Sequence, residues 1–507
     1  MRGKLLDWAD QLESRVKGMS LSLDDCPFIM PISIFFLFLA FLLGESKGRM
    51  VMDEQYLIRL GERILKEGNF FGETFSWLCM ENAQEWVNHE PLSSILFYLA
   101  DKVFHDGGPV LLGGISGAAA ASICVKKRKW RSWGLSGILL FAFLLLSLLL
   151  CTHPRAYVLT FPLFAVMVCC LRDSYEDMDL LLFLPPISML WAWLNGGSAH
   201  MAWIFPLIFA FFTLFSDILS RIPMVEVRVP KTSAAHYAGT AVICAAVQFL
   251  VPYSSRSFFY AFHQSWRGCP YIAEFQRNGI LIFIIGNLSF TALAAWNVFI
   301  RKKKVDPACA CIYLGCTVAG LAVTRFQPYA GMSAALILTD GLMDISGKGK
   351  VRNAPMLRHV IAVVPVLLVI AAFMNGYTLS MQRPAEELLP ALEEASPKRI
   401  YTDIHCGNWL DGNGEFFCFT DGRGDCYTRE QLEDAFLCSL GPGDSKDLSK
   451  ECGRGVGDVV EKYQFDAMLV QKGTALDEWV NGKGNDSYWM EKETESYSLW
   501  LKNEVDF

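Results

Sequence analysis

The chain has 507 residues, of which 52% are hydrophobic and 19% are charged, and its formal net charge is −7. A soluble protein of this length usually carries more charge and fewer apolar residues, so the composition excludes an ordinary soluble enzyme. The basic residues lie in short clusters between apolar runs, and the acidic excess lies largely after Pro384. This pattern lacks the basic footprint of a nucleic-acid-binding protein.

The first 27 residues are polar, and they contain no apparent cleavable signal peptide. Four apolar residues recur there at roughly helical spacing: Leu5, Trp8, Leu12 and Val16. This spacing is typical of an amphipathic helix on the cytoplasmic membrane surface, and a solvated lead-in explains it equally well.

Long apolar runs follow, and their length indicates a polytopic α-helical membrane protein. We expect about eleven transmembrane helices within residues 28–376. Their approximate positions are 28–44, 108–125, 133–151, 155–171, 180–195, 201–220, 234–252, 278–300, 307–324, 328–345 and 358–376.

The basic clusters predict the orientation of the chain in the cell membrane. With the N-terminus in the cytoplasm, four alternate loops carry them, as the positive-inside rule requires. These loops are 126–131, 221–231, 301–304 and 348–358. The long first loop, 45–107, and the C-terminal part are then extracytoplasmic.

The composition changes after the last apolar run, and residues 377–507 are predicted to form an extracytoplasmic α/β domain. We expect strands at 399–401, 416–419 and 467–470, and helices at 429–437 and 475–480. The domain has five cysteines that could pair in an oxidising compartment, and their spacing does not resemble a zinc site. They are Cys406, Cys418, Cys426, Cys438 and Cys452.

The first outer loop begins with an acidic pair, Asp53 and Glu54, followed by an amphipathic stretch to Glu67. Leu57, Leu60, Ile64 and Leu65 form its apolar stripe, which predicts a helix lying on the membrane surface. The acidic pair has two interpretations. It caps this helix, or it supplies a catalytic carboxylate at headgroup depth.

A second motif, Asn88-His89-Glu90-Pro91, precedes a predicted helix at 92–104. Pro91 suits the first position of a helix, so Asn88 or Glu90 is explained as a helix-start residue. In the functional interpretation, His89 binds a phosphate or a metal ion and Glu90 assists it.

Two arginines lie in very short outer turns, where a charge requires an anionic partner or access to water. Arg155 follows His153 in one turn, and Arg325 lies in the other. The outer loop 253–277 adds further basic residues and Glu274. Transfer from a polyprenyl phosphate needs cations that stabilise the departing phosphate and a carboxylate that removes a proton.

The segment Asp421-Gly422-Arg423-Gly424-Asp425 is typical of a glycine-bearing turn after a strand. That explanation is favoured over one in which Arg423 and Asp425 bind an acceptor sugar.

Taken together, these motifs resemble the GT-C glycosyltransferase superfamily, which includes the protein O-mannosyltransferases and the aminoarabinose transferases of lipid A. The resemblance extends to a group of bacterial GT-C-like membrane proteins and covers nearly the full chain. It is carried by the acidic pair, 86–92, the Arg155 turn, 193–196, 274–276, the Arg325 loop, 384–385, 399–401, 407–410 and 421–423.

The resemblance implies an inverting glycosyltransferase with Asp53 as the catalytic carboxylate and Glu54 beside it. Its donor would be a polyprenyl-phosphate-linked sugar, and its acceptor a glycan, lipid or protein of the cell envelope. His89, Glu90, His153, Arg155, Glu274 and Arg325 would bind substrate.

No cofactor is implied with certainty, and a divalent cation stays open. The 152–157 turn lacks the acidic residue that several members carry there, which argues against metal dependence. Two alternatives are a transporter or flippase of a lipid-linked glycan and a non-catalytic glycolipid-binding protein. Few charges near the middle of spans and the absence of a convincing repeat disfavour transport.

Overall fold

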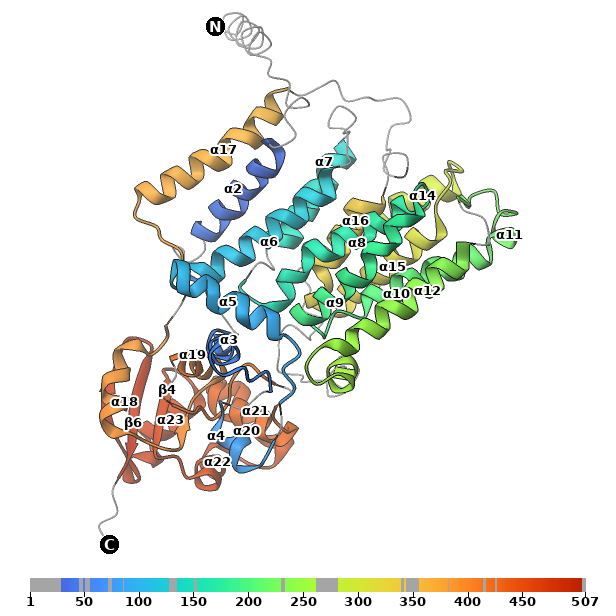
Figure 1. The fold of residues 1–507 in the computed structure, drawn as a ribbon. Helices are drawn as coiled ribbons and strands as arrows, with labels where there is room; N and C mark the ends of the chain where they lie inside the picture. The colour runs from blue at the N-terminus through green and yellow to red at the C-terminus, as the bar shows by residue number, and fades with distance from the viewer. Residues whose placement is uncertain are drawn as a thin grey trace, which may run out of the picture.

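The protein is described from a computed structural model (Figure 1). The described residues are 29–44, 49–50, 55–71, 75–84, 86–126, 135–149, 153–228, 233–260, 281–338, 342, 355–381, 383–413, 416–424 and 426–503. Predictions about the N-terminal segment, the acidic pair Asp53–Glu54 and Glu274 lie outside these residues.

Most of the chain forms a bundle of apolar α-helices (Figure 1). Its helices are α2 (Ile29–Gly44), α6 (Gly107–Lys126), α7 (Leu135–Leu149), α8 (Phe161–Asp173), α9 (Leu184–Leu194), α10 (Met201–Leu214), α11 (Ser216–Leu219), α12 (Ala234–Val247), α14 (Leu281–Phe299), α15 (Pro307–Ala322), α16 (Gln327–Ile337) and α17 (Pro355–Met374). Short 3₁₀ helices precede or follow several of them: η3 (Ala156–Thr160), η4 (Met178–Phe183), η6 (Gln248–Leu250) and η8 (Thr324–Phe326).

Each predicted apolar run contains one of these helices, but some helices are shorter than the transmembrane helix predicted for the run. The run predicted at 201–220 is interrupted, because α10 ends at Leu214 and the short α11 follows. Within the described residues, two helices are long and apolar enough to cross a membrane, Gly107–Val125 and Ala156–Asp173. The other apolar helices that this comparison finds have 10–17 residues, so the count of eleven spans stays a prediction.

Small residues bring the bundle helices close together. A Cβ atom on Gly114 of α6 would lie 2.5 Å from Cδ1 of Leu42 in α2. A Cβ atom on Gly331 of α16 would lie 2.0 Å from Oγ of Ser147 in α7. Such contacts are typical of helix pairs in membranes, where close van der Waals packing replaces the hydrophobic effect.

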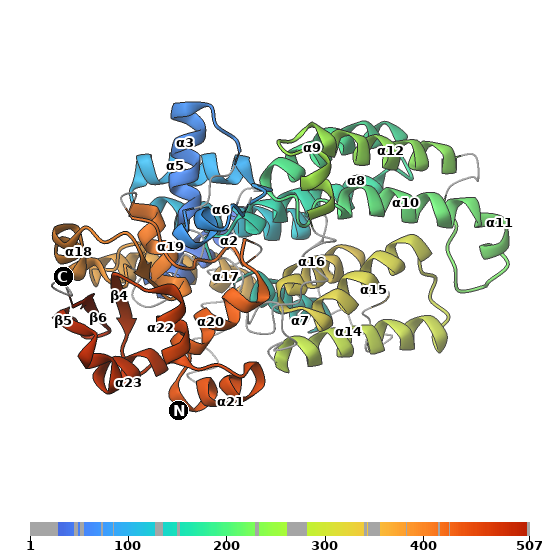
Figure 2. The same cartoon turned by 90° about the horizontal axis from the view of Figure 1, so that it is seen from below.

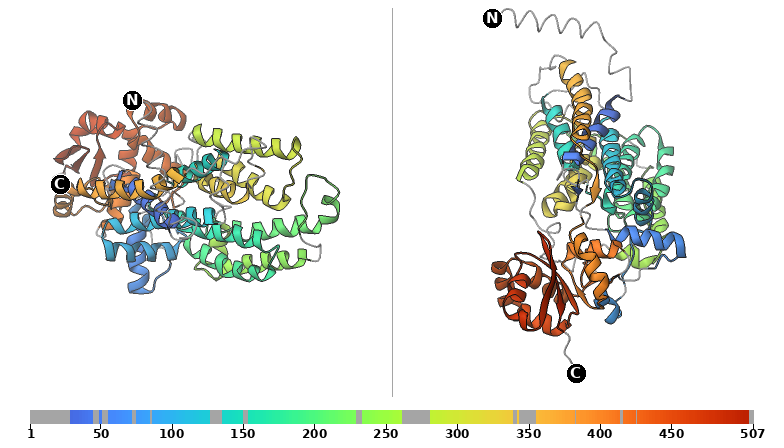
Figure 3. Two further views of the ribbon diagram at one scale, coloured as in Figure 1. Left: turned by 90° about the horizontal axis from the view of Figure 1, so that it is seen from above. Right: turned by 90° about the vertical axis from the view of Figure 1, so that its left-hand side faces the viewer.

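The C-terminal part of the chain forms an α/β domain at one end of the bundle (Figures 1 and 3). Its sheet has the order β3-β4-β6-β5, in which only the β3–β4 pair is parallel. The strands are β3 (Ile400–Tyr401), β4 (Ala467–Gln471), β5 (Tyr488–Glu493) and β6 (Tyr497–Lys502). The helices are η9 (Glu386–Leu388), α18 (Leu389–Ala395), α19 (Ile404–Asn413), α20 (Arg429–Ser439), α21 (Pro442–Cys452), α22 (Val456–Tyr463), α23 (Ala475–Asn481) and η10 (Lys483–Asp486).

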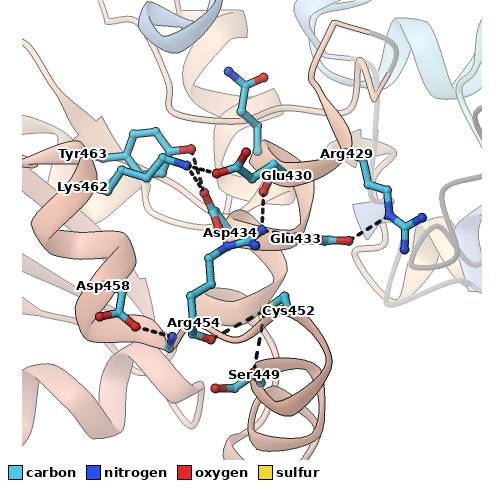
Figure 4. A network of polar contacts seen from close by, with 12 residues as sticks. Arg429, Glu430, Glu433, Asp434, Ser449, Cys452, Arg454, Asp458, Lys462 and Tyr463 are labelled. Carbon is cyan, nitrogen blue, oxygen red and sulfur yellow. Dashed lines mark hydrogen bonds and ion pairs between the residues drawn. The ribbon is translucent and has the colours of Figure 1, made fainter.

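An ion-pair network joins the helices of this domain (Figure 4). Asp434 of α20 is fully buried, and it accepts hydrogen bonds from Lys462 Nζ at 2.7 Å and from the Tyr463 hydroxyl at 2.8 Å. Arg454, between α21 and α22, pairs with Asp434 and with Glu433. The hydrogen bonds and ion pairs from these partners offset the free-energy cost of burying the Asp434 carboxylate. They also hold together the helices that carry the partners.

The first outer loop contains α3 (Tyr56–Glu67), α4 (Trp77–Glu81) and α5 (Pro91–Phe104). Helices α3 and α5 cross between the bundle and the C-terminal domain (Figures 1 and 2). The buried face of α3 includes Tyr56 and Gly61, which the predicted stripe does not contain. Leu65 is 49% exposed, and Gly61 takes its place because a glycine lets α3 approach α5 closely.

The first outer loop and the C-terminal domain share a hydrophobic core. The indole of Trp77 contacts Phe419, Tyr463 and Phe465, and its Nε1 donates to the carbonyl of Ile400 at 3.1 Å. The predicted strand 416–419 is reduced to a single bridge, in which Cys418 pairs with Ser76 of this loop. The strand prediction failed because its partner comes from a distant part of the chain.

A second link between the two regions joins the ends of the first and last bundle helices. Strand β1 (Arg49–Met50), after α2, pairs in parallel with β2 (Ser380–Met381), after α17. The five cysteines of the C-terminal domain, which could pair in an oxidising compartment, are unpaired in the structure.

Candidate functional site

Glu90 is the residue around which the candidate site is built. It occupies the N-cap position of α5, and Pro91 begins the helix, as the sequence predicts for a helix start. However, its side chain makes no capping hydrogen bond, and the Asn88 side chain accepts from the Glu90 backbone N–H at 3.1 Å instead. The carboxylate is therefore free to point into the protein, where it is only 2% exposed.

Three side chains surround the Glu90 carboxylate. The hydroxyl of Tyr56, at the start of α3, donates to Oε1 at 3.3 Å. The amide of Asn195, directly after α9, donates to Oε2 at 3.2 Å. His89 Nε2 lies 3.6 Å from the same oxygen. Residues from two outer-loop helices and one bundle helix thus meet at a single carboxylate.

The chain around Glu90 is held by backbone contacts as well. The carbonyl of His89 accepts from the N–H of Gly196 at 2.7 Å, and a Cβ atom on Gly196 would lie 3.2 Å from that carbonyl. A glycine allows this close approach. The His89 ring stacks on Tyr260, with 3.7 Å between ring centroids.

Arg325 lies close enough to Glu90 for the two charges to attract each other. Its guanidinium stacks on the ring of Tyr157, 4.5 Å from the centroid. Burial raises the pKa of Glu90 to about 7, although the charge of Arg325 and the hydrogen bonds from Tyr56 and Asn195 act to lower it. A carboxylate with this pKa exchanges protons readily near neutral pH.

Arg155 brings a second positive charge to the site. It precedes η3, and its charge and that of Arg325 repel each other, so the two outer turns lie close together. Two arginines in neighbouring turns supply the kind of charged donors that bind an anion such as a phosphate.

The structure therefore brings together four of the residues predicted from the sequence: His89, Glu90, Arg155 and Arg325. His153 is half-buried in the same turn as Arg155. The N-cap position of α3 is Gln55, directly after the acidic pair.

Tyr56 and Asn195 were not predicted as site residues. Tyr56 directly follows the acidic pair, and its ring belongs to the apolar face of α3, so its position suggested only a core role. Asn195 ends an apolar helix, where an amide usually caps the chain. The available signals were a polar residue at the end of a bundle helix and its place in the 193–196 segment of the resemblance.

One group of potential metal ligands occurs in the described part of the chain: Asp411, Cys418 and Asp421. The group is a poor cation site, because the Arg423 guanidinium already pairs with the Asp421 carboxylate. Nε of Arg423 lies 3.0 Å from each oxygen of that carboxylate. Burial raises the pKa of the Asp411 carboxyl and the Cys418 thiol well above their ordinary values, which favours their neutral forms. Because the Arg423 guanidinium already neutralises the Asp421 carboxylate, we assign no metal to this group.

The sequence matches no family model and no curated protein. Two solved structures share the architecture. The oligosaccharyltransferase of Archaeoglobus fulgidus, in its apo form, is 11% identical with a TM-score of 0.50, covering 94% of this chain and 75% of that chain. ArnT from Cupriavidus metallidurans, bound to undecaprenyl phosphate, is 12% identical with a TM-score of 0.52, covering 96% of this chain and 99% of that one.

The chain has the GT-C fold. The resemblance found in the sequence is thus confirmed at the level of the fold, over nearly the full length of the chain. In this fold, the candidate site lies where the first outer loop, the bundle and the short outer turns meet.

Proposed function

We propose that this protein is an integral-membrane glycosyltransferase that moves a sugar from a polyprenyl-phosphate-linked donor to a cell-envelope acceptor on the outer face of the membrane. The observation that carries the proposal is that Arg325 lies close both to the buried carboxylate of Glu90 and to Arg155. ArnT, which shares the fold, was solved with undecaprenyl phosphate bound, and this supports a donor of the same chemical class.

In this proposal Arg155 and Arg325 hold the phosphate of the donor. An acceptor hydroxyl attacks the anomeric carbon, the bond from that carbon to the phosphate oxygen breaks, and polyprenyl phosphate leaves with the bonding electrons. Two guanidinium groups stabilise the charge that develops on the leaving phosphate. The single displacement inverts the anomeric configuration.

The proton of the acceptor hydroxyl passes to a carboxylate of the first outer loop. We assign this role to Asp53, as the resemblance implies, with Glu54 as its neighbour. Glu90 orients Arg325 and contacts the donor sugar, and His89 and His153 complete the polar surroundings. The C-terminal domain, which shares a core with this loop, selects the acceptor.

The phosphate-binding step is tested with undecaprenyl phosphate and purified protein. Arg155→Ala and Arg325→Ala should each weaken binding about 10- to 100-fold, as expected for the loss of a charge-assisted hydrogen bond. Arg228→Ala is the control, because Arg228 is 41% exposed and pairs with Glu226 in a loop predicted to be cytoplasmic. Equal affinity in all three variants would overturn the assignment of the arginines.

The transfer step is tested in vesicles by following label from a polyprenyl-phosphate-sugar pool into envelope acceptors. Asp53→Asn should lower turnover by about 10²- to 10⁴-fold while leaving lipid binding intact, since general bases contribute that much. Full transfer by Asp53→Asn at matched protein levels would contradict its role as the base. Binding without transfer by the wild type would instead favour the flippase or scaffold alternative.

A further inference from the structure

Arg423 of the C-terminal domain is fully buried, although it lies in a short turn between α19 and α20. Asp421 binds its guanidinium through Nε and Nη2 and is itself fully buried. Although burial acts to raise it, the charge of Arg423 holds the pKa of Asp421 below its ordinary value. The pair is therefore ionised, and both charges are shielded from water.

The guanidinium of Arg423 contacts the aromatic rings of the first outer loop. Its central carbon lies 5.3 Å from the ring centroid of Tyr56, 5.2 Å from that of Phe75 and 5.3 Å from that of Trp86. The Tyr56 and Trp86 rings also meet edge to face, 5.8 Å apart. A cation among three aromatic rings is held strongly when water is excluded. We call Tyr56, Phe75 and Trp86 the aromatic box.

The aromatic box leads directly to the candidate site, because the hydroxyl of Tyr56 donates to Glu90. We propose that Arg423 is a positioning residue that fixes the Tyr56 ring and thereby sets the orientation of the Glu90 carboxylate. The C-terminal domain then shapes the site at the membrane face without touching the donor. The effect of Arg423 on turnover rests on the proposed function. The positioning of Tyr56 and Glu90 by Arg423 does not depend on that function.

Docking alone does not account for this arrangement. The domain is already held to the first outer loop by the Ser76–Cys418 bridge, the Trp77–Ile400 hydrogen bond and the shared core. Among the described residues, Nη1 of Arg423 has no hydrogen-bond partner, and the guanidinium meets the loop through the rings of the box. Burying the Arg423 guanidinium carries a large desolvation cost. Attachment of the C-terminal domain, which other contacts already provide, does not explain that cost.

Tyr56→Phe tests the link from the box to the carboxylate, because it removes the hydroxyl and keeps the ring. His89, Tyr56 and Arg325 are the titratable groups described against Glu90, so losing one hydrogen bond to its ionised form should raise its pKa. We expect a rise of about half to one unit. It is measured by infrared titration of the carboxyl band that Glu90→Gln removes.

The Asp421→Asn/Arg423→Met double variant tests the link from Arg423 to the box. It removes both charges together, so no uncompensated buried charge is left to unfold the domain. We expect the pKa of Glu90 to rise in the same direction as in Tyr56→Phe. Combining the double variant with Tyr56→Phe should add less than the sum of the two shifts, since both act through one hydroxyl.

The matched control is Asp434→Asn/Arg454→Met, the same two changes at another ion pair of the C-terminal domain, in which the carboxylate is buried and the arginine is partly exposed (Figure 4). It should lower the thermal stability and leave the Glu90 titration unchanged. An unchanged Glu90 titration in a folded Asp421→Asn/Arg423→Met protein would overturn the proposal. The titration requires no turnover, so this failure is distinct from a failure of the proposed transferase activity, which the vesicle assay reports.

Discussion

Glu90 shows how a helix-start residue becomes available for chemistry. Its backbone does what the sequence predicts, with Pro91 at the first position of α5. Its carboxylate, however, is bound by Tyr56 and Asn195, and it lies beside Arg325, 235 positions further along the chain. Local spacing identified the residue, but its burial and partners depend on contacts between distant segments.

The raised pKa of Glu90 predicts a pH dependence of stability. The folded carboxyl keeps its proton to about pH 7, whereas its ordinary pKa is 4.5, so folding is favoured while the proton is bound. This contribution is fully present below about pH 4.5 and is lost as the pH rises through about 7. The loss is on the order of 3 kcal/mol, at 1.36 kcal/mol for each pKa unit.

Thermal unfolding in detergent between about pH 5 and pH 8 measures this effect, with Glu90→Gln as the control that lacks the ionising group. The Tm of the wild type should fall more steeply with rising pH than that of Glu90→Gln. Groups away from Glu90 titrate alike in both proteins, so the difference between the two curves reports Glu90 and its contact with His89. Parallel curves would contradict a buried, proton-binding Glu90.

At the scale of elements, the sequence reveals what is encoded locally. Apolar runs predicted the bundle helices, and the 57–66 stretch predicted α3, because hydropathy and helical periodicity are properties of one segment. The sequence did not reveal β5, β6 or the β1–β2 pair, because a strand is defined by its partner. The sequence likewise did not reveal the contacts of Arg423, because the aromatic box lies in a loop more than 300 residues earlier.

The crossing of α3 and α5 gives a prediction at this scale. A Cβ atom on Gly61 would lie 2.1 Å from the carbonyl oxygen of Ser94, so Gly61→Ala forces the helices apart. We expect a destabilisation of about 1–3 kcal/mol, as is typical of overpacking. Because α3 carries Tyr56 and α5 follows Glu90, undecaprenyl phosphate binding should weaken as well.

The control for Gly61→Ala is Gly239→Ala in α12, where a Cβ atom would meet nothing within 4 Å. Both glycines lie inside helices, so alanine changes helix propensity equally and only the packing differs. Thermal unfolding compares the two variants. A Gly61→Ala protein as stable as Gly239→Ala would show that the helices do not cross this closely.

At the scale of the whole molecule, the pairing of β1 with β2 relates the first outer loop to the C-terminal domain. These strands follow the first and the last bundle helix, so both regions lie at the same end of the bundle (Figures 1 and 3). The structure fixes this relation without reference to a membrane. Which side of the membrane that end faces is a separate matter, for which the basic loops are the guide.

The positive-inside pattern predicts that this end faces outward, and the site chemistry requires the same of a transferase acting on envelope acceptors. Alkaline phosphatase fused after the C-terminal domain should therefore be active, because it folds only outside the cytoplasm, whereas a fusion within the basic loop 301–304 should be inactive. The reverse pattern would place Glu90, Arg155 and Arg325 on the cytoplasmic face. An outward-facing transferase would then be ruled out even if the arginines bind lipid phosphate, because donor and acceptor would meet on the wrong side.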